Sequence, residues 1–425
     1  MSTIFDLDES VVTDLVRAVT ADSSAAELAA ADVAERFARA AWTAIAEPGD
    51  RYAGVLVEAI GAPAALTVLL GNGSGKGDGA AMRRAVLDHG GQDLPVAELQ
   101  TAIDRWSPRL KASEVVTALG QAQRYSVNLL MPGDRFWPTG FDDLGPHGPI
   151  AIWVRGNLST LDTLDSSIAL VGARAATGYG EHVTMEASAG LVDRGYTIVS
   201  GAAYGIDGMA HRAALASSGQ TIAFLAGGVD RFYPSGHDAL LTRIVEKGAV
   251  VSELPCGSSP TKWRFLQRNR LIAASSLATI VLEAGWRSGS LNTAGHAASL
   301  GRPLGAVPGP VTSAASAGCH RLIREFDATC VTNADQMAEL APLARTSSGA
   351  LIDPVAVLPS RSLAEPTSDT VRVLDALSTR APRASEDVAA RAGLSVAAVR
   401  AVLGTLELGG GVVERDRGWL RKNAR

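Results

Sequence analysis

LPCGSSPTKWRFLQRNRLIAASSLATIVLEAGWRSGSLNTAGHAASLGR, residues 254–302, contains the pattern that decides the fold. A short apolar run at 278–282 leads into a loop of small polar residues, Ser288–Thr293, which opens a helical pattern. A buried strand that passes through such a loop into a helix is typical of an α/β sheet. Because free backbone N–H groups at the start of a helix favour anions, the loop is a candidate phosphate site.

Cations and aromatic residues alternate just before this strand. The cations are Lys262, Arg264, Arg268 and Arg270, and the aromatic residues between them are Trp263 and Phe265. This mixture suits a polyanion that carries stackable bases. A solvated basic helix face with an aromatic pair in the core is the plainer interpretation, and this stretch alone does not decide between the two.

Apolar, strand-like runs alternate with helical patterns from Ile150 onward. They lie at 150–154, 168–172, 196–201, 221–228, 249–252, 278–284 and 305–309. Near-continuous apolar strands separated by helices predict a parallel sheet with both faces covered. We therefore predict an α/β protein with a Rossmann-like, doubly wound, mostly parallel sheet, whose ligand binds at the carboxyl ends of the strands.

The flanking sequence predicts further domains. Residues 1–130 carry successive helical patterns, one of them at 51–70, and predict a small helical domain of the SAM or helix-hairpin type. We place the Rossmann-like core at 145–341 and a Pro-, Ser- and Ala-rich linker at 342–366. Residues 367–425 carry three helical patterns and a strand pair, which predict a winged helix. Its basic residues outnumber its acidic ones only ten to seven, so DNA binding and protein interaction are equally compatible with it.

Composition restricts the function further. The net charge of −5 gives no overall attraction to nucleic acid, so any such binding needs a local basic patch. The three cysteines, Cys256, Cys319 and Cys330, are not spaced as metal ligands, and we expect no metal, cofactor or disulfide framework. The N-terminus lacks the pattern of a signal peptide, and no apolar run reaches the ~18 residues of a membrane span. We expect a cytoplasmic protein.

Two strand-end loops supply further candidates. The turn VGARAATGYG, residues 171–180, contains Arg174, which could pair with a phosphate, and Thr177, which could cap the next helix. Its glycines do not follow the dinucleotide-binding spacing, and an ordinary turn is the alternative. The next loop contains Gly201. Asp207 and His211 then lie one helical turn apart; we favour a capping aspartate bonded to a structural histidine over an acid–base pair.

A third glycine-rich segment imitates a phosphate-binding loop. GNGSGKGDG, residues 71–79, has Leu70 where the Walker pattern needs glycine and Gly77 where it needs the magnesium-binding hydroxyl. We interpret it as a loop between helices.

Together these motifs resemble the DprA/Smf family, the DNA-processing proteins of bacterial natural transformation. The matching pieces are VGARAATGYG, SGAAYGIDGMAH, AGGVDRFYP, VVSELPCGSSPTKWRFLQRNRLIA, EAGWRSGSLNTA, GRPLGAVPGP and SAGCHRLI, which cover about 168–325 almost without a gap. The resemblance implies a Rossmann-like core that binds single-stranded DNA, forms a homodimer and loads the RecA recombinase. It implies no catalytic residues.

The resemblance also implies a set of DNA-binding residues. Carried over position by position, they are Arg174, Thr177, Gly201, Lys262, Phe265, Arg268, Asn269, Arg270, Ser288, Gly289, Ser290 and Thr293. The chain departs from the family pattern at Ala173, Leu266, Ala203–Tyr204 and Cys319–His320. None of these departures removes a charge or an aromatic ring, so the implied DNA binding survives them.

One alternative remains a different class of protein. Rossmann-like nucleotide hydrolases of the phosphoribohydrolase type place a carboxylate at a strand end beside a phosphate loop, and Glu283 occupies such a position here. The aromatic and basic segment would be unneeded for a mononucleotide, which favours the nucleic-acid interpretation.

Overall fold

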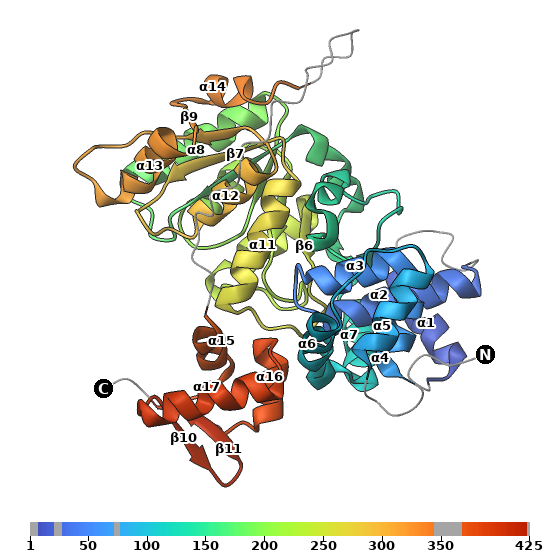
Figure 1. Cartoon of the computed structure of the whole chain (residues 1–425). Helices are drawn as coiled ribbons and strands as arrows, with labels where there is room; N and C mark the ends of the chain where they lie inside the picture. Colours follow the sequence, from blue (N-terminus) through green and yellow to red (C-terminus); the bar gives the residue numbers. More distant parts are fainter. Residues whose placement is uncertain (1–6, 21–27, 72–76, 344–367, 423–425) are drawn as a thin grey trace.

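The computed structural model describes residues 7–20, 28–71, 77–343 and 368–422, and a nine-stranded sheet forms the centre of this part (Figure 1). The strand order is β1-β2-β6-β5-β4-β3-β7-β8-β9. The strands are β1 (Val127–Leu130), β2 (Ile152–Gly156), β3 (Ser167–Gly172), β4 (Thr197–Ser200), β5 (Thr221–Phe224), β6 (Ala249–Ser252), β7 (Ala278–Glu283), β8 (Leu304–Ala306) and β9 (Thr329–Cys330). All strands from β6 to β9 in this order are parallel, whereas β2 is antiparallel to both neighbours. The predicted doubly wound, mostly parallel sheet is confirmed.

Helices cover both faces of this sheet. They are α8 (Gly178–Asp193), α9 (Ile206–Ala216), α10 (Asp238–Lys247), α11 (Lys262–Ala274), α12 (Ser290–Ser299), α13 (Ala317–Glu325) and α14 (Ala334–Glu339). Because side chains alternate along a strand, Ile168 and Leu170 of β3 pack in one core with α8 and α9, and Ala169 and Val171 pack in another with α11 and α12. The run from Ile168 to Val171 is therefore apolar at every position, because both of its faces are covered.

The direction of winding reverses between β3 and β7. The chain runs from β3 through β4 and β5 to β6 on one side, and then returns to the other side of β3 for β7, β8 and β9. In open α/β sheets the loops diverge at such a point and leave a crevice at the carboxyl ends of the strands. The loops after β3 and β7 border that crevice.

Helices α1 to α7 form the N-terminal part. They are α1 (Glu9–Val19), α2 (Ala30–Ile45), α3 (Arg51–Ile60), α4 (Ala62–Leu70), α5 (Gly79–Asp88), α6 (Val96–Trp106) and α7 (Ala112–Arg124). Their core continues onto the sheet, where buried Trp153 of β2 donates a hydrogen bond to Thr43 Oγ1 at 3.2 Å.

Two details of this part differ from the sequence predictions. The helix expected at 51–70 is two helices, because Gly61 between them has a φ of 79° that ends α3. Residues 127–130, predicted within the helical domain, form β1 at the edge of the sheet. Four residues that directly follow a helix carry too little periodicity to be separated from it.

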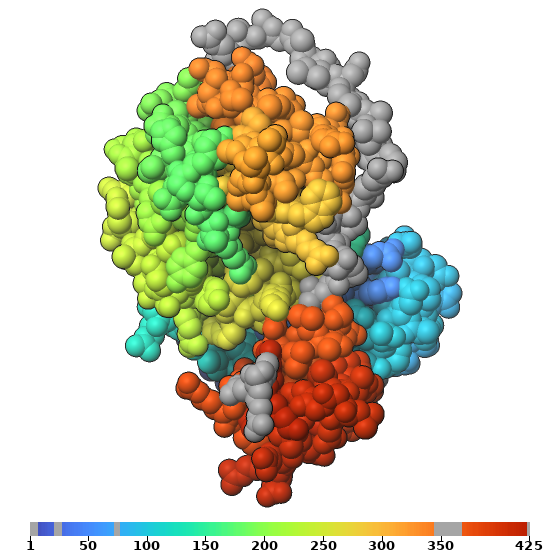
Figure 2. Space-filling view, turned by 90° about the vertical axis from the view of Figure 1, so that its left-hand side faces the viewer, coloured from blue at the N-terminus to red at the C-terminus, as the bar shows by residue number. Residues whose placement is uncertain are grey.

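The described C-terminal residues form the predicted winged helix, with a core of their own. Its elements are α15 (Asp369–Ala376), α16 (Ser385–Ala392), α17 (Val396–Leu408), β10 (Val412–Arg415) and β11 (Gly418–Arg421). It abuts both the N-terminal helices and α11 (Figures 1 and 2). Short 3-10 helices occupy Ser107–Arg109, Thr139–His147, Leu158–Ser166, Ser235–His237 and Ala314–Ser316.

Some sequence predictions fall outside the described residues. Most of the loop at 71–79 and of the linker at 342–366 belongs to the segments 72–76 and 344–367. Within the described residues no single helix is long and apolar enough to cross a membrane; two sharply bent pairs, α3–α4 and α16–α17, pass on length and composition alone.

Candidate nucleic-acid interface

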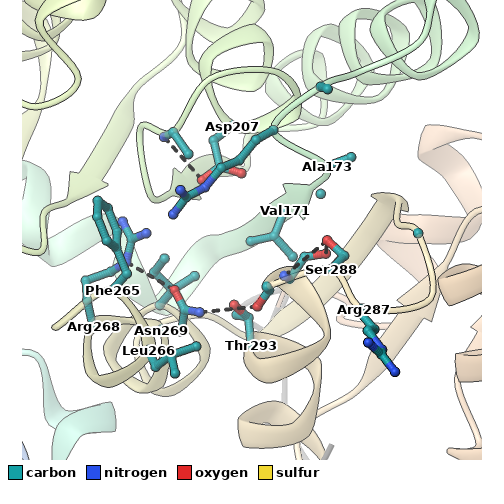
Figure 3. Close-up of a pocket in the computed structure, with 18 of the residues that line it drawn as sticks. Val171, Ala173, Asp207, Phe265, Leu266, Arg268, Asn269, Arg287, Ser288 and Thr293 are labelled. Carbon is teal, nitrogen blue, oxygen red and sulfur yellow. Dashed lines mark hydrogen bonds between the residues drawn. The ribbon is translucent and has the colours of Figure 1, made fainter. Parts of the chain in front are cut away.

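A cavity of about 560 Å³ lies at the carboxyl ends of β3 and β7, where the winding reverses (Figure 3). This volume is within the range of about 300–1,000 Å³ that is usual for ligand sites. Eight of the twelve predicted site residues line it: Arg174, Phe265, Arg268, Asn269, Ser288, Gly289, Ser290 and Thr293. Segments that are about 90 residues apart in the sequence therefore meet around one space.

Arg174 and Phe265 form one wall of the cavity. Arg174 is exposed in the loop after β3, and its guanidinium carbon lies 4.7 Å from the centroid of the Phe265 ring. A cation over an aromatic face is attracted by the electrons of the ring. A base that reaches Phe265 must therefore replace the guanidinium or stack on its planar surface.

The Arg174 loop is held by a close backbone approach at Gly205. Gly205 has a φ of 74°, and a Cβ there would lie 2.3 Å from the carbonyl oxygen of Ala173. The N–H of Ile206 donates to that same carbonyl at 3.1 Å. Only glycine allows this approach, which fixes the start of α9 against the loop that carries Arg174.

Arg268 lines the cavity but is almost fully buried. It donates to the carbonyls of Gly201, at 2.6 Å, and Phe224. Burial lowers the pKa of Arg268 to about 10, against the opposing charge of Asp207, so the side chain stays protonated at neutral pH. Arg268 therefore adds a positive charge to the site, but its guanidinium is committed to protein carbonyls and is not the free strand contact that the sequence suggested.

Gly201 and Asp207 accommodate this arginine. A Cβ on Gly201 would lie 2.2 Å from Arg268 Nη1, so a larger residue would displace the guanidinium. Asp207 lines the cavity and accepts from the N–H of Gly201 at 3.2 Å. Burial raises the pKa of the Asp207 carboxyl, and the Arg268 and Arg174 charges act in the opposite direction. Gly201 itself does not line the cavity.

The loop and first turn of α12 form the opposite wall. The hydroxyls of Ser288 and Ser290 lie 2.8 Å apart, and Asn269 Nδ2 donates to Gly289 O at 3.4 Å. Gly289 is exposed, and a Cβ there would meet no atom within 4 Å. The buried Thr293 lies one turn further along α12. The N–H groups of Leu291 and Asn292 already donate to Ser288 O and Gly289 O within this turn. The start of the helix nevertheless lines the cavity, and the positive end of its dipole favours a phosphate there.

Thr177 and Glu283 brace the two loops from behind. The Thr177 hydroxyl caps α8 by accepting from Gly180 N at 3.2 Å, as predicted. The same hydroxyl donates to Glu283 Oε1 at 2.6 Å, and the Thr177 N–H donates to Oε2 at 2.9 Å. Thr177 therefore positions the Arg174 loop without lining the cavity. Glu283 is 2 % exposed and is absent from the cavity wall, so it is poorly placed for the hydrolytic role considered above.

Lys262 and Arg270, both predicted as DNA contacts, lie elsewhere on α11 and do not line the cavity. Lys262 is exposed at the first position of α11, where its N–H donates to Asp375 Oδ2 of the winged helix at 3.3 Å. Arg270 is 3 % exposed, and its guanidinium pairs with Glu253 at 2.7 Å. The partners of both residues, Asp375 and Glu253, come from distant segments, so the spacing along α11 alone could not indicate these contacts.

Sequence reasoning missed several residues at the cavity. Trp286 and Arg287, between β7 and the serine loop, both line it and are exposed. Tyr233, 50 % exposed, lies with its ring centroid 5.7 Å from that of Phe265. The signal for Trp286 and Arg287 was their position directly before Ser288.

The Asp207–His211 pair is structural, although not in the form we favoured. His211 is buried and its Nδ1 lies 2.7 Å from Thr221 Oγ1, whereas Asp207 accepts from backbone amides. Burial lowers the pKa of His211 to about 3. Across the described ranges, no cluster of three or more His, Cys, Asp or Glu side chains is suited to a metal ion.

The third helix of the winged helix offers little charge for reading DNA. Arg400 is the exposed cation on α17, and it pairs with Glu386 at 2.8 Å. The start of α17, at Ser395–Ala397, borders a cavity whose other wall is α6 and the 3-10 turn after it. The end of the helix that would enter a DNA groove therefore faces the N-terminal helices.

Comparison with known families settles the identity of the core. The model of DNA recombination-mediator protein A matches residues 128–342, which is half of the chain. The chain belongs to this family. The model of the DprA winged helix domain matches residues 358–416. The matched region begins within β1, so the strand that sequence reasoning missed is part of the family core. Family members are DNA-binding recombination mediators rather than enzymes.

Individual relatives agree with this family. A putative DNA processing protein DprA from Mycobacterium tuberculosis is 44 % identical over 301 residues, covering 68 % of this chain and 76 % of its own length. The solved DprA of Streptococcus pneumoniae aligns with 73 % of this chain and 99 % of its own, at 27 % identity and a TM-score of 0.57. The solved DprA of Helicobacter pylori, which binds single-stranded DNA, aligns with 51 % of this chain and 95 % of its own, at 29 % identity and a TM-score of 0.46.

Proposed function

We propose that this DprA-family chain binds single-stranded DNA in the cavity between β3 and β7. The observation that carries the proposal is the pairing of Arg174 with Phe265 opposite the start of α12. One wall offers a stacking surface and a cation, and the other offers serine hydroxyls and the positive end of the α12 dipole. A single strand presents both bases and phosphates to such a groove, whereas a duplex keeps its bases stacked inside.

The proposed roles divide the predicted site residues into two groups. Arg174 and the Ser288–Ser290 loop contact phosphate, and Phe265 contacts a base. Thr177, Gly201 and Arg268 position those groups from behind, because their bonds go to protein atoms. Lys262, exposed at the start of α11, extends the basic surface toward the winged helix.

We further propose that the bound strand is protected and handed to the RecA recombinase during natural transformation, and that the chain acts as a homodimer through its Rossmann-like core. The family match and the cavity proposed above to hold the strand support this assignment, since a mediator must hold the strand on which the recombinase assembles. Light scattering of the purified chain tests the dimer. RecA-dependent ATP hydrolysis on oligonucleotides coated with single-strand-binding protein tests the loading of RecA. The chain should shorten the lag before ATP hydrolysis begins, and an unchanged lag would refute the loading role.

The binding proposal is tested by the affinity of an Arg174→Glu variant for a labelled oligonucleotide across a salt series. Each phosphate contact contributes about 0.7 to the slope of log affinity against log salt for single strands, so loss of Arg174 should flatten the slope by at least that amount. Arg243→Glu is the control, because Arg243 is exposed on α10 outside the cavity. Equal losses of affinity and equal flattening of the salt slope in the two variants would show that the cavity is not the binding site.

A further inference from the structure

Trp286 is an unusual surface residue at the far wall of the cavity. It is 55 % exposed, although tryptophan is a large side chain that folding normally removes from water. All seven tryptophans lie in the described residues, and Trp286 alone among them is exposed. Its neighbours in the sequence, Gly285 and Arg287, also line the cavity. An indole kept in water at the edge of a cavity needs a reason other than packing.

The ring of Trp286 is held in place by a cation. The guanidinium carbon of Arg321, on α13, lies 5.0 Å from the Trp286 ring centroid and 5.3 Å from that of Phe326. Arg321 Nε also donates to Glu325 Oε2 at 3.1 Å, so three contacts orient this guanidinium. One side of the indole is thus supported while more than half of its surface remains open.

This arrangement repeats the first wall of the cavity. Phe265 has the Arg174 guanidinium at 4.7 Å, and Trp286 has the Arg321 guanidinium at 5.0 Å. The two aromatic residues belong to different elements, α11 and the loop after β7, and both line the same space. Ser288–Ser290, the candidate phosphate contact, begins two residues after Trp286 in that loop. Two aromatic surfaces that flank a phosphate site fit successive nucleotides of one strand.

We propose that Trp286, oriented by Arg321, is a second base-stacking surface, so that the bound strand extends from Phe265 across the cavity to α13. This inference rests on the proposed function and extends it from one base contact to a track. The ligand is a single strand of any sequence, because every base offers a flat face for stacking.

The test combines fluorescence with a length series of oligothymidylates. In the wild-type chain, a long oligonucleotide should quench emission from Trp286, and Trp286→Phe should remove that quench while keeping the affinity. Trp286→Ala should weaken binding of long oligonucleotides by about 5- to 150-fold, which corresponds to about 1–3 kcal/mol for one stacked base. The same variant should bind the shortest oligonucleotides with unchanged affinity, because they reach only Phe265.

Arg321→Ala and Arg324→Ala form a matched pair, since both remove one cation from α13 and only Arg321 contacts Trp286. Arg321→Ala should weaken the binding of long oligonucleotides more than Arg324→Ala does. Equal affinities of wild type and Trp286→Ala at every length would overturn the second surface. Emission that responds to protein concentration instead of DNA would also overturn it and would point to a contact between copies. If the wild type binds no oligonucleotide at all, the proposed function itself fails, which is a distinct result.

Discussion

Replacement of Glu47 by glutamine should destabilise the chain strongly, because this one carboxylate joins three parts of the molecule. Glu47 follows α2, and its side chain is 9 % exposed. Its Oε1 lies 3.0 Å from Arg109 Nη2 and 2.8 Å from Arg264 Nη2, at the start of α11. Arg372 of the winged helix adds a third nearby charge and lies over the Trp263 ring at 4.9 Å.

The expected magnitude follows from the pKa of Glu47. Burial alone would raise this pKa, but the charges of Arg264, Arg109 and Arg372 outweigh burial and lower it from 4.5 to about 2. At 1.36 kcal/mol per pKa unit, the ionised form contributes about 3 kcal/mol to the free energy of unfolding at neutral pH. Loss of one partner of a buried ion pair costs a similar amount, about 3–5 kcal/mol.

Urea unfolding of wild type and Glu47→Gln at several pH values measures this contribution. Because the folded-state pKa is depressed, the difference between the two proteins should be complete above pH 4.5 and should vanish as the pH falls through about 2. Glu58→Gln, which removes an exposed carboxylate from α3, is the control and should change the free energy of unfolding little. A free energy of unfolding for Glu47→Gln within about 0.5 kcal/mol of the wild-type value at pH 7 would show that this carboxylate does not stabilise the fold.

Three further outcomes are expected. Phe265→Ala should weaken single-strand binding by about 1–3 kcal/mol while leaving the salt slope nearly unchanged, as titration across salt concentrations would show; an altered slope at full affinity would contradict a stacking role. Gly205→Ala should lower the free energy of unfolding in urea by at least the ~1–3 kcal/mol of backbone strain, since its Cβ would also meet Ala173 O; a neutral variant would disprove the close approach. His211→Gln should flatten the fall in stability between pH 6.5 and about 3, because wild-type His211 stays neutral when folded and takes up a proton only on unfolding; parallel profiles for the two proteins would exclude this.

The sheet was predictable because its strands are buried on both faces. The run at 168–172 is apolar at every position, the run at 278–282 is apolar except for the buried Thr279, and each is followed by a helical pattern. The two strands that were not predicted are short. Strand β1 has four residues, and β9 has two residues that are both exposed. Such strands exist because a neighbour supplies hydrogen bonds, which leaves no periodic pattern in the sequence.

The candidate site was predictable in composition but not in detail. The loops that carry Arg174 and Ser288 could be placed together, since both follow parallel strands. The contacts of the α11 arginines could not be predicted, because their partners come from other segments. The Arg268 guanidinium donates to two backbone carbonyls, and the Arg270 guanidinium pairs with Glu253. The domain boundaries drawn from composition stay predictions.

The most direct test of the account is photo-crosslinking of the full chain to a single strand that contains 5-iododeoxyuridine, followed by trypsin and mass spectrometry. A halogenated base reacts with the aromatic side chain on which it stacks. If the strand lies in the cavity between β3 and β7, crosslinks should form in the peptide Phe265–Arg268 and should be lost in Arg174→Glu. Crosslinks confined to the winged helix, with none at Phe265, would contradict the claim that the cavity between β3 and β7 holds the strand.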